Sequence, residues 1–563
     1  MDRNFILAIV LSFLVVLTYQ NWRAHHAPQL PSRTEAPTQS ATEAPQAPGA
    51  QMPPAPAPQA TPAPSGGAAG AFDTNAPEQR ITIENELYRA ELTTRGGGIA
   101  SWQLKKYRTS KDADAPPIDL VAGSPPEPPG LATPLPELGL GDLGFAPFRV
   151  VESGPDHASF ELSLNGVTVR KRFDFAADSY SLRLRIEVAN GSAAPVQSGF
   201  AATWPATLRP GSDFMRESMI VLHEGSATRA PVRGLGKPGI TGRLAGKTGT
   251  ETPVYRGDVD WVGVDSTYFL VAIVDPLPRD AIASFEPRGD TGAVASIGYP
   301  SSPIPPGLTD SREFRVFAGP KERPLLEAFG SGTEASVQLG YRWVAPLTRA
   351  FLWLLHALYA VIPNYGVGIV LLTILVRLAM QPLNVRQMRS MKRMSELQPK
   401  VQEIQKKYAD DRQKQSEETM KLYREAGVNP LGGCFPILLQ FPVLMGLYYA
   451  LQSSIDLRQA PFLGWIRDLS APEALFTLPG LDLPVRFLPI VMGLSMVVQQ
   501  KLTPSTMDPA QARMMMTVMP VMFTVMFYQL PSGLVLYWFV SNLLAIGSQI
   551  WMQRGKKDAP ARS

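Results

Sequence analysis

Arg377 stands in the middle of TILVRLAMQPL (373–383), inside a segment, residues 364–385, that is otherwise apolar and long enough to cross a bilayer. At 1.5 Å per residue, Arg377 lies about 12 Å from the nearer end of that segment. Snorkelling of the side chain would shorten this distance without removing it. Because a charge near the bilayer centre costs roughly 3 kcal/mol on insertion scales, an arginine at this position indicates a function.

Polar side chains accompany Arg377. Thr373, Arg377 and Gln381 are four residues apart, so a helix places them on one face. Asp and Glu are missing from all five C-terminal apolar segments, so a polar, water-filled concavity with a positive centre fits better than a buried ion pair. The other apolar segments contribute Gln440, Thr517, Thr524, Ser541 and Gln549. We therefore predict a wet interior for this part of the chain.

Two other motifs invite a chemical interpretation that their surroundings do not support. GRLAGKTG (242–249) has three residues between Gly242 and Gly246, where a P-loop has four. Cys434 is the only cysteine and has no histidine beside it, which favours a small buried apolar residue over a nucleophile or metal ligand. The acids and histidines elsewhere form no recognisable catalytic set. The sequence therefore predicts no enzyme, no metal site and no cofactor.

Six apolar segments are predicted to cross the membrane. The first, FILAIVLSFLVVLTY, is either a signal peptide or an anchor, and the missing small-residue cleavage site and Trp22 favour an uncleaved anchor over residues 1–22. Eleven prolines between residues 28 and 64 make the linker 23–79 an extended tether. The other predicted transmembrane helices are residues 364–385, 433–452, 486–502, 514–530 and 533–552.

Loop charges predict the orientation of these segments. Residues 386–432 carry eleven Lys and Arg, against two in residues 453–484, so the positive-inside rule places the former in the cytoplasm. Both termini, including the tail 553–563, are then cytoplasmic, and residues 23–363 lie on the outer side.

The segment 341–362 could be a further span or a helix in the membrane surface. Arg342, Arg349 and His356 recur every seven residues on one stripe, which suits a surface helix. A span here would turn the basic loop outward, against the positive-inside rule. We therefore predict an interfacial amphipathic helix.

Residues 386–428 are predicted to form a cytoplasmic helical hairpin. Their apolar residues follow one another at spacings of three or four, and ADDRQ makes a plausible turn. Sixteen of the twenty methionines occur from Met380 onward, and flexible Met-rich surfaces suit promiscuous apolar partners. The alternatives are a solvated helix pair without a partner and ordinary membrane packing of the methionines.

Residues 80–330 are predicted to form a large antiparallel β domain, a twisted sandwich. Runs such as ASFELSLNGVTVRKRFDF alternate apolar and polar residues with period two, and NG and GG signals separate the runs. The domain has no cysteine, so packing alone must hold it together. The net charge of +4 is too small for a chain of 563 residues to indicate a specific nucleic-acid partner.

Three segments carry a resemblance to a known family. NPLGGCFPILLQFPVLMGLYYAL (429–451), LRQAPFLGWIRDLS (457–470) and PSGLVLYWFVSNLL (531–544) closely resemble the YidC family of membrane protein insertases. The anchor, tether and β domain match its Gram-negative bacterial form, so the resemblance covers essentially the whole chain. It implies a polytopic α-helical membrane protein of the inner membrane, with six transmembrane helices, a five-helix insertase core and an all-β periplasmic supersandwich domain.

The resemblance also implies a mechanism and partners. A hydrophilic groove, open to cytoplasm and lipid, would take nascent membrane proteins, and Arg377 falls on the family's groove arginine. Tyr537 and Trp538 fall in the final span, where family members contact substrate. The implied partners are the Sec translocon, membrane lipids, and ribosomes or targeting factors at the hairpin.

Two rival functions can be stated. A solute or ion transporter is disfavoured by the missing intramembrane carboxylates and the lack of an obvious inverted repeat. A membrane-tethered sugar-binding protein would rest on the β domain alone, whose family shape is related to sugar-mutarotase folds, and shape implies no sugar chemistry.

Overall fold

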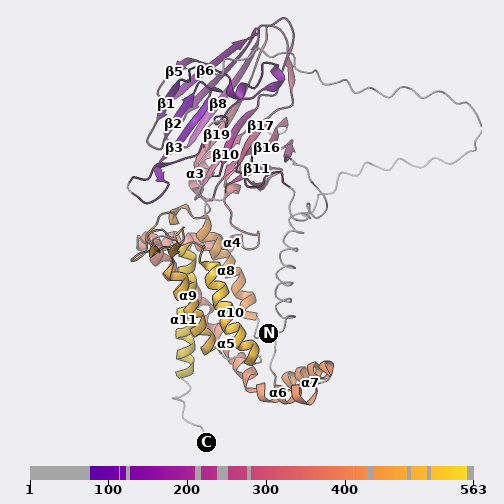
Figure 1. Ribbon diagram of the computed structural model, residues 1–563, viewed down its shortest axis with the longest axis vertical. Helices are drawn as coiled ribbons and strands as arrows, with labels where there is room; N and C mark the ends of the chain where they lie inside the picture. The colour runs from indigo at the N-terminus through magenta and orange to yellow at the C-terminus, as the bar shows by residue number, and fades with distance from the viewer. Residues whose placement is uncertain are drawn as a thin grey trace, which may run out of the picture. The chain divides into compact units, whose positions relative to one another are not determined.

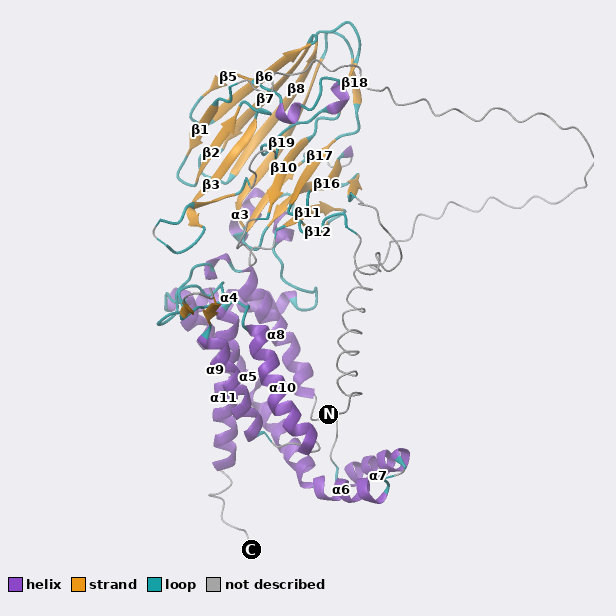
Figure 2. Cartoon of the chain, in the orientation of Figure 1, coloured by secondary structure: helices purple, strands orange, loops and turns teal. Residues whose placement is uncertain are grey.

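The computed structural model describes residues 77–112, 114–121, 127–208, 217–237, 252–275, 280–409, 411–427, 435–478, 483–503 and 509–554. These residues form a β domain, 80–320, and a helical part from Ala345 onward (Figures 1 and 2). The predicted anchor, the glycine-rich motif 242–249 and Cys434 lie outside the described residues, as do most of the predicted linker and tail.

A nine-stranded antiparallel sheet forms the largest layer of the β domain. Its strands are, in pairing order, β12 (Ser226–Pro231), β11 (Ser218–His223), β14 (Val259–Asp265), β15 (Phe269–Val274), β19 (Thr309–Pro320), β8 (Ser181–Asn190), β7 (Val167–Phe175), β6 (His157–Leu164) and β5 (Arg149–Ser153). The turn between β6 and β7 is Asn165–Gly166, and both residues have positive φ, of 51° and 80°. This is the two-residue hairpin that an NG pair favours, as the sequence predicted.

Smaller sheets complete the domain. The first consists of β10 (Ala202–Thr207), β17 (Gly292–Gly298), β16 (Ile282–Arg288) and β13 (Val254–Arg256), and the second of β1 (Arg80–Glu84), β2 (Tyr88–Thr93), β3 (Gly98–Arg108) and β4 (Pro117–Asp119). A further pair is β9 (Val196–Ser198) with β18 (Ser302–Ile304). The sheet containing β17 packs against β14 and β11 of the nine-stranded sheet, so two layers enclose a core.

Alternation along the strands decides which side chains enter that core. In β8, Leu182, Leu184 and Ile186 are buried while Arg183 and Arg185 are exposed, because successive side chains of a strand point to opposite faces. The largest fully buried side chains include Trp102, Trp204 and Trp261. A period-two pattern therefore produced a sheet with one packed and one solvated face.

The helical part begins with α4 (Ala345–Val361), after the short helix α3 (Arg323–Phe329). The longer helices that follow are α5 (Tyr365–Glu396), α8 (Phe435–Ser453), α9 (Phe487–Leu502), α10 (Pro509–Phe527) and α11 (Ser532–Arg554). α11 packs against α9 and α5, α10 packs against α9, and α4 packs against α8 and α5 (Figure 2). The predicted segments 341–362, 433–452, 486–502, 514–530 and 533–552 each overlap one of these helices, and the segment 364–385 lies within the longer helix α5.

Apolar side chains cover the outside of these helices. Leu494 of α9, Val525 of α10 and Trp551 of α11 are 68%, 69% and 72% exposed. Large exposed apolar surfaces mark contact with another apolar phase. By length and composition, Tyr365–Glu396 and Ser532–Trp551 could each cross a membrane, while Phe487–Leu502 and Met516–Phe527 are shorter apolar helices. The structure therefore supports a helical membrane core, and the count of six crossings stays a prediction.

The predicted hairpin contains α6 (Gln398–Lys407) and α7 (Arg412–Glu425), which pack against each other (Figure 1). Asp411 begins α7 as its N-cap, because its side chain accepts hydrogen bonds from the backbone N–H groups of Gln413 and Lys414. α5 does not end at residue 385, where the sequence analysis placed the end of the span. It continues to Glu396, with Pro382 inside it, so span and hairpin share one helix.

Candidate functional site

Arg377 of α5 reaches across to α11. Its Nε donates a hydrogen bond of 2.9 Å to Ser541 Oγ, and its Nη2 donates a second bond, of 2.5 Å, to the same oxygen. Arg377 is partly buried, and no carboxylate among the described residues pairs with it. The guanidinium is therefore anchored by a neutral hydroxyl and keeps its charge uncompensated by protein acids.

Two further predicted residues join this site. Tyr537 lies one helical turn before Ser541 on α11, is 3% exposed and is close enough to Arg377 to interact with its charge. Gln440 of α8 donates from Nε2 to the Tyr537 hydroxyl over 3.2 Å. Three helices thus bring together Arg377, Gln440, Tyr537 and Ser541, which we call the arginine cluster.

Thr373 and Gln381 do not join the arginine cluster through hydrogen bonds. Thr373 is 1% exposed, and its hydroxyl donates to Ile369 O of its own helix over 2.6 Å. This local bond satisfies the hydroxyl, as threonines inside helices often do. Gln381 is partly buried and has no hydrogen bond within the described residues. All three predicted residues lie in α5, so their spacing of four residues places them on one face of that helix. Of these three, Arg377 is the one with a hydrogen bond to another helix among the described residues.

Trp538 belongs to an aromatic group instead. Its ring centroid lies 4.8 Å from that of Phe527 and 6.1 Å from that of Phe523, both on α10. Tyr537 and Trp538 are adjacent in sequence and therefore leave the helix about 100° apart. One therefore faces the arginine cluster while the other packs toward α10. A binding role for either residue stays a prediction.

Reasoning from the sequence missed a second polar contact between helices. Asn542 Nδ2 of α11 donates to Ser495 Oγ of α9 over 3.0 Å, and Gln549 Nε2 donates to Thr503 Oγ1 over 3.0 Å. We call these two pairs the α9–α11 seam. Gln549, one of the polar groups noted in the C-terminal segments, makes its hydrogen bond within the seam. The seven-residue spacing of Asn542 and Gln549 was the signal that could have revealed it.

The hydroxyl of Thr524, another predicted polar group, is likewise committed locally. It donates to Pro520 O over 2.7 Å within α10. The carbonyl that Pro520 leaves without a donor is that of Met516, four positions earlier, so this bond does not replace the missing one. It is the ordinary bond of a helical threonine to the carbonyl four residues before it.

The loop 454–475 is hydrogen-bonded to the starts of two helices. Ser532 Oγ at the start of α11 donates to Asp468 O over 2.7 Å, and Gly533 N donates to Leu469 O over 2.9 Å. Glu473 is buried and accepts from Leu488 N over 2.7 Å, which satisfies the first turn of α9. The loop thereby fixes the ends of two helices that carry the site.

The arrangement is suited to binding rather than to bond-making chemistry. Among the described residues, no group of three or more His, Cys, Asp or Glu side chains could hold a metal ion. An arginine has five donors in a planar fork and matches carboxylates well. The arginine cluster is therefore a candidate receptor for acidic or other hydrogen-bond-accepting groups that enter the helical part.

Comparison with known proteins gives strong similarities. Residues 80–354 match the family model described as YidC periplasmic domain, and residues 357–559 match the model described as 60Kd inner membrane protein. The chain is 34% identical to a membrane protein insertase YidC of Syntrophus aciditrophicus (strain SB), over 98% of this chain and 100% of that relative. It is also 34% identical to one of Pelobacter propionicus, over 87% and 90% respectively. A solved structure described as an active YidC insertase with its first transmembrane domain resolved is 19% identical, with a TM-score of 0.36, over 84% of this chain and 92% of that one.

Proposed function

This chain belongs to the YidC family of membrane protein insertases, and from that premise we propose that its arginine cluster receives the hydrophilic part of a nascent membrane protein. The protein is a membrane protein insertase of the inner membrane with a periplasmic β domain, and it is not an enzyme. Insertion acts on nascent membrane proteins. Its central physical problem is the movement of polar chain through an apolar layer.

Arg377 carries this proposal, because it is a charge without a counter-ion in the described part of the chain. Ser541 fixes the position of the guanidinium through Nε and Nη2, which leaves the remaining N–H donors for water or substrate. In a medium of low dielectric constant, a positive centre attracts carboxylates far more strongly than it does in water. An acidic segment in the groove would therefore replace water around Arg377 at little cost.

The apolar part of the substrate supplies the driving force. Burying an apolar helix in lipid is favourable by about 25 cal/mol per Å² of apolar surface, so no nucleotide is required. The exposed apolar side chains of α9 and α10 would contact such a helix as it enters the lipid. The flexible methionines of α10 would let this surface fit substrates of different sequence.

The proposal includes an orientation and further partners. Six crossings would place both termini in the cytoplasm and residues 23–363 in the periplasm, with α4 in the membrane surface. The highly charged hairpin of α6 and α7 would contact ribosomes or targeting factors, and larger substrates would be handled with the Sec translocon. The charge difference between the loops on either side supports this orientation. The transporter and sugar-binding alternatives have no observation in their favour beyond those already weighed.

The decisive experiment measures insertion of a single-span substrate into liposomes that contain only this protein. Two matched substrates, one with an acidic and one with a neutral translocated tail, would each be tested on the parent protein and on Arg377→Lys, Arg377→Ala and Arg377→Glu. All four proteins would be present at equal levels. Lysine keeps the charge but loses the planar fork, so it should retain much of the activity. Alanine and glutamate should be progressively worse, chiefly for the acidic tail. If Arg377→Glu inserts the acidic tail as fast as the parent, the electrostatic role is wrong.

A further inference from the structure

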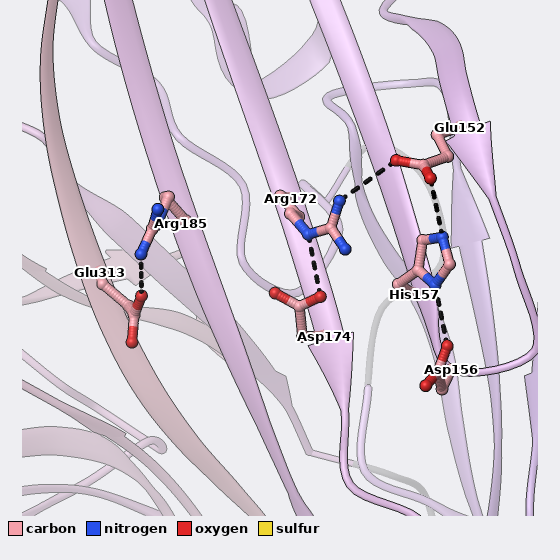
Figure 3. A network of polar contacts seen from close by, with 7 residues as sticks. All are labelled: Glu152, Asp156, His157, Arg172, Asp174, Arg185 and Glu313. Carbon is pink, nitrogen blue, oxygen red and sulfur yellow. Dashed lines mark hydrogen bonds and ion pairs between the residues drawn. The ribbon is translucent and has the colours of Figure 1, made fainter.

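The solvated face of the nine-stranded sheet carries arginines that are paired with acids, with one exception. Arg149 and Arg170 both donate to Glu161, whose two oxygens are divided between them. Figure 3 shows the next set: Arg172 contacts Glu152 and Asp174, and Arg185 contacts Glu313 at 2.9 Å. Most positive charge on this face is therefore neutralised by a neighbouring strand or by the same strand.

Arg183 and Arg315 are the exception. They are direct cross-strand partners in the register of β8 and β19, so two like charges stand opposite each other. Within the described residues neither has an ion pair. Asp174 lies opposite Arg183 on the other side, but its Oδ1 already accepts from Arg172 Nε at 2.9 Å. Like charges directly opposite destabilise a sheet, so this pair is retained against a cost.

The two guanidinium groups differ in how firmly they are held. Arg315 lies over the ring of Phe329, 4.5 Å from its centroid, and its Nη2 donates to Phe329 O over 2.7 Å. The Arg183 side chain is exposed and makes no hydrogen bond among the described residues. One arginine is thus positioned in advance, while the other is free to close on a ligand.

Both arginines line one open cleft of about 270 Å³. The cleft is also lined by Phe329, by the carboxylate of Asp174, which is paired with Arg172, and by residues 175–176 and 181–182. The backbone N–H groups of Phe175 and Ala176 are already committed to Asp156 O and Ser181 O. The charged donors of the cleft are therefore the two guanidinium groups.

We propose that Arg183 and Arg315 form a binding site for acidic segments of polypeptide on the β domain. The proposal rests on the proposed function, because translocated segments of substrates emerge on the side where a periplasmic domain lies. Two closely spaced carboxylates would neutralise both arginines, each through a fork of two N–H donors. The cleft would receive acidic segments that have left the arginine cluster.

A phosphate group is the less suitable occupant. Protein sites for phosphate usually offer backbone N–H groups at helix N-termini or in nests. Here Phe329 is at the C-terminal end of α3, and its carbonyl faces Arg315. This end of a helix presents carbonyl groups and not the N–H donors that phosphate sites use. A chain-borne carboxylate needs only the guanidinium forks.

The test uses the full-length protein in detergent micelles and a fluorescent peptide with a central Asp-Gly-Asp and blocked termini. Fluorescence anisotropy should show saturable binding that is absent for the matched Asn-Gly-Asn peptide. Arg183→Gln and Arg315→Gln should each weaken binding about tenfold, as expected for loss of a charge-assisted hydrogen bond. Because Arg183 has no ion pair among the described residues and faces the like charge of Arg315, Arg183→Gln should not lower the temperature of thermal unfolding.

Arg149→Gln is the matched control. It removes the same charge from the same face, but three strand spacings from β8, roughly 14 Å, which exceeds the screening length of about 8 Å at physiological salt. Its binding should equal that of the parent. Arg377→Ala should also bind the peptide normally, which separates failure of this site from failure of the proposed groove.

Three outcomes would overturn the assignment. Unchanged peptide affinity of Arg183→Gln together with Arg315→Gln would remove the arginines from the site. Equal affinity for the Asn-Gly-Asn peptide would remove the charge requirement. Loss of binding to phosphatidylglycerol vesicles in the double variant, with peptide binding intact, would identify lipid headgroups as the ligand instead.

Discussion

At the scale of single residues, Arg377 is bonded to a neutral hydroxyl where a buried arginine would usually be paired with a carboxylate. Among the described residues, Arg377 donates its side-chain hydrogen bonds to Ser541, and the neutral hydroxyl orients the guanidinium without cancelling its charge. A carboxylate in the same place would form a buried ion pair with Arg377. Breaking such a pair is costly, so the positive charge would not be available to a substrate. The hydroxyl is therefore the feature that keeps Arg377 useful for binding.

Ser541→Ala should reduce insertion of acidic-tailed substrates by several-fold. Without the hydroxyl, the Arg377 guanidinium would no longer be held in one position. The corresponding loss of free energy is at most about 1.5–3 kcal/mol, the range typical of hydrogen bonds to charged groups. Ser541→Thr keeps a hydroxyl and should retain most of the activity. Ser548→Ala is the control, because Ser548 donates only to Ala545 O of its own helix. Equal losses for both alanine variants would show that Ser541 acts only through helix stability.

A second residue pair makes the attachment of α4 depend on pH. His356 Nε2 of α4 lies 2.9 Å from Asp456 Oδ2 of the loop 454–475. The hydrogen bond to Asp456 raises the pKa of His356, and the same bond lowers the pKa of Asp456. The histidine contribution is complete below its ordinary pKa of about 6.5 and is lost as pH rises through the raised value. The aspartate contribution is complete above its ordinary pKa of about 3.9 and is lost on acidification.

The pair should therefore hold α4 best between about pH 4 and pH 6.5 and release it at alkaline pH. Hydrogen exchange of the α4 amides, corrected for intrinsic rates, should accelerate between pH 6 and pH 9. Both side chains are about half exposed, so the effect is limited to roughly 1 kcal/mol. His356→Gln should lack this pH dependence. If it behaves like the parent, another group controls α4.

At the scale of elements, polar pairs rather than apolar packing distinguish one helix interface. α11 meets α9 through the seam of Asn542 with Ser495 and Gln549 with Thr503. Within lipid, apolar faces gain little from contacting each other, so interhelical hydrogen bonds and close packing decide which faces meet. The seam therefore specifies the partner and rotation of α11, which in turn points Tyr537 and Ser541 toward Arg377.

A double-mutant cycle measures this contact. Asn542→Ala, Ser495→Ala and their combination should show a coupling free energy of about 0.6 kcal/mol, the average for such bonds in membranes. The measurement is reversible unfolding in mixed micelles. Thr517→Ala on α10 is the comparison, because that residue lies outside the seam. Strict additivity of the two single effects would show that the observed 3.0 Å contact does not stabilise the helix pair.

The hairpin of α6 and α7 is the element with the clearest separable role. Replacing Gln398–Glu425 with a short Gly/Ser linker should slow delivery or capture of nascent chains while the remaining helices stay folded. The reason is that the hairpin is polar and highly charged, whereas the core helices pack on one another. Insertion would be timed with ribosome-bound substrates and, as a control, with released purified substrate. Normal rates in both assays would reduce the hairpin to a connector.

At the scale of the whole molecule, orientation in the membrane decides which surfaces meet which partners. With Cys434→Ala as background, cysteines at Ser416 of α7 and Leu463 of the loop 454–475 should label from opposite sides, cytoplasmic and periplasmic respectively. Both positions are exposed, and Leu463 is 63% exposed, whereas Ser454 in the same loop region is buried. Membrane-impermeant maleimide added to intact spheroplasts and to inverted vesicles provides the measurement. Labelling from one common side contradicts the six-span orientation.

Sequence patterns by themselves determined the periodic features of this protein. Helix and strand geometry fixes which positions of one element share a face, so the β domain, the Asn165–Gly166 hairpin and the isolation of Arg377 could be predicted. The same patterns could not say that Ser541 anchors Arg377, that Thr373 and Thr524 bond within their own helices, or that Gln549 serves the seam. Those facts depend on the packing between elements distant in the chain. Tertiary structure alone placed Arg183 opposite Arg315, because the pairing register of two strands is set by contacts that no local spacing encodes.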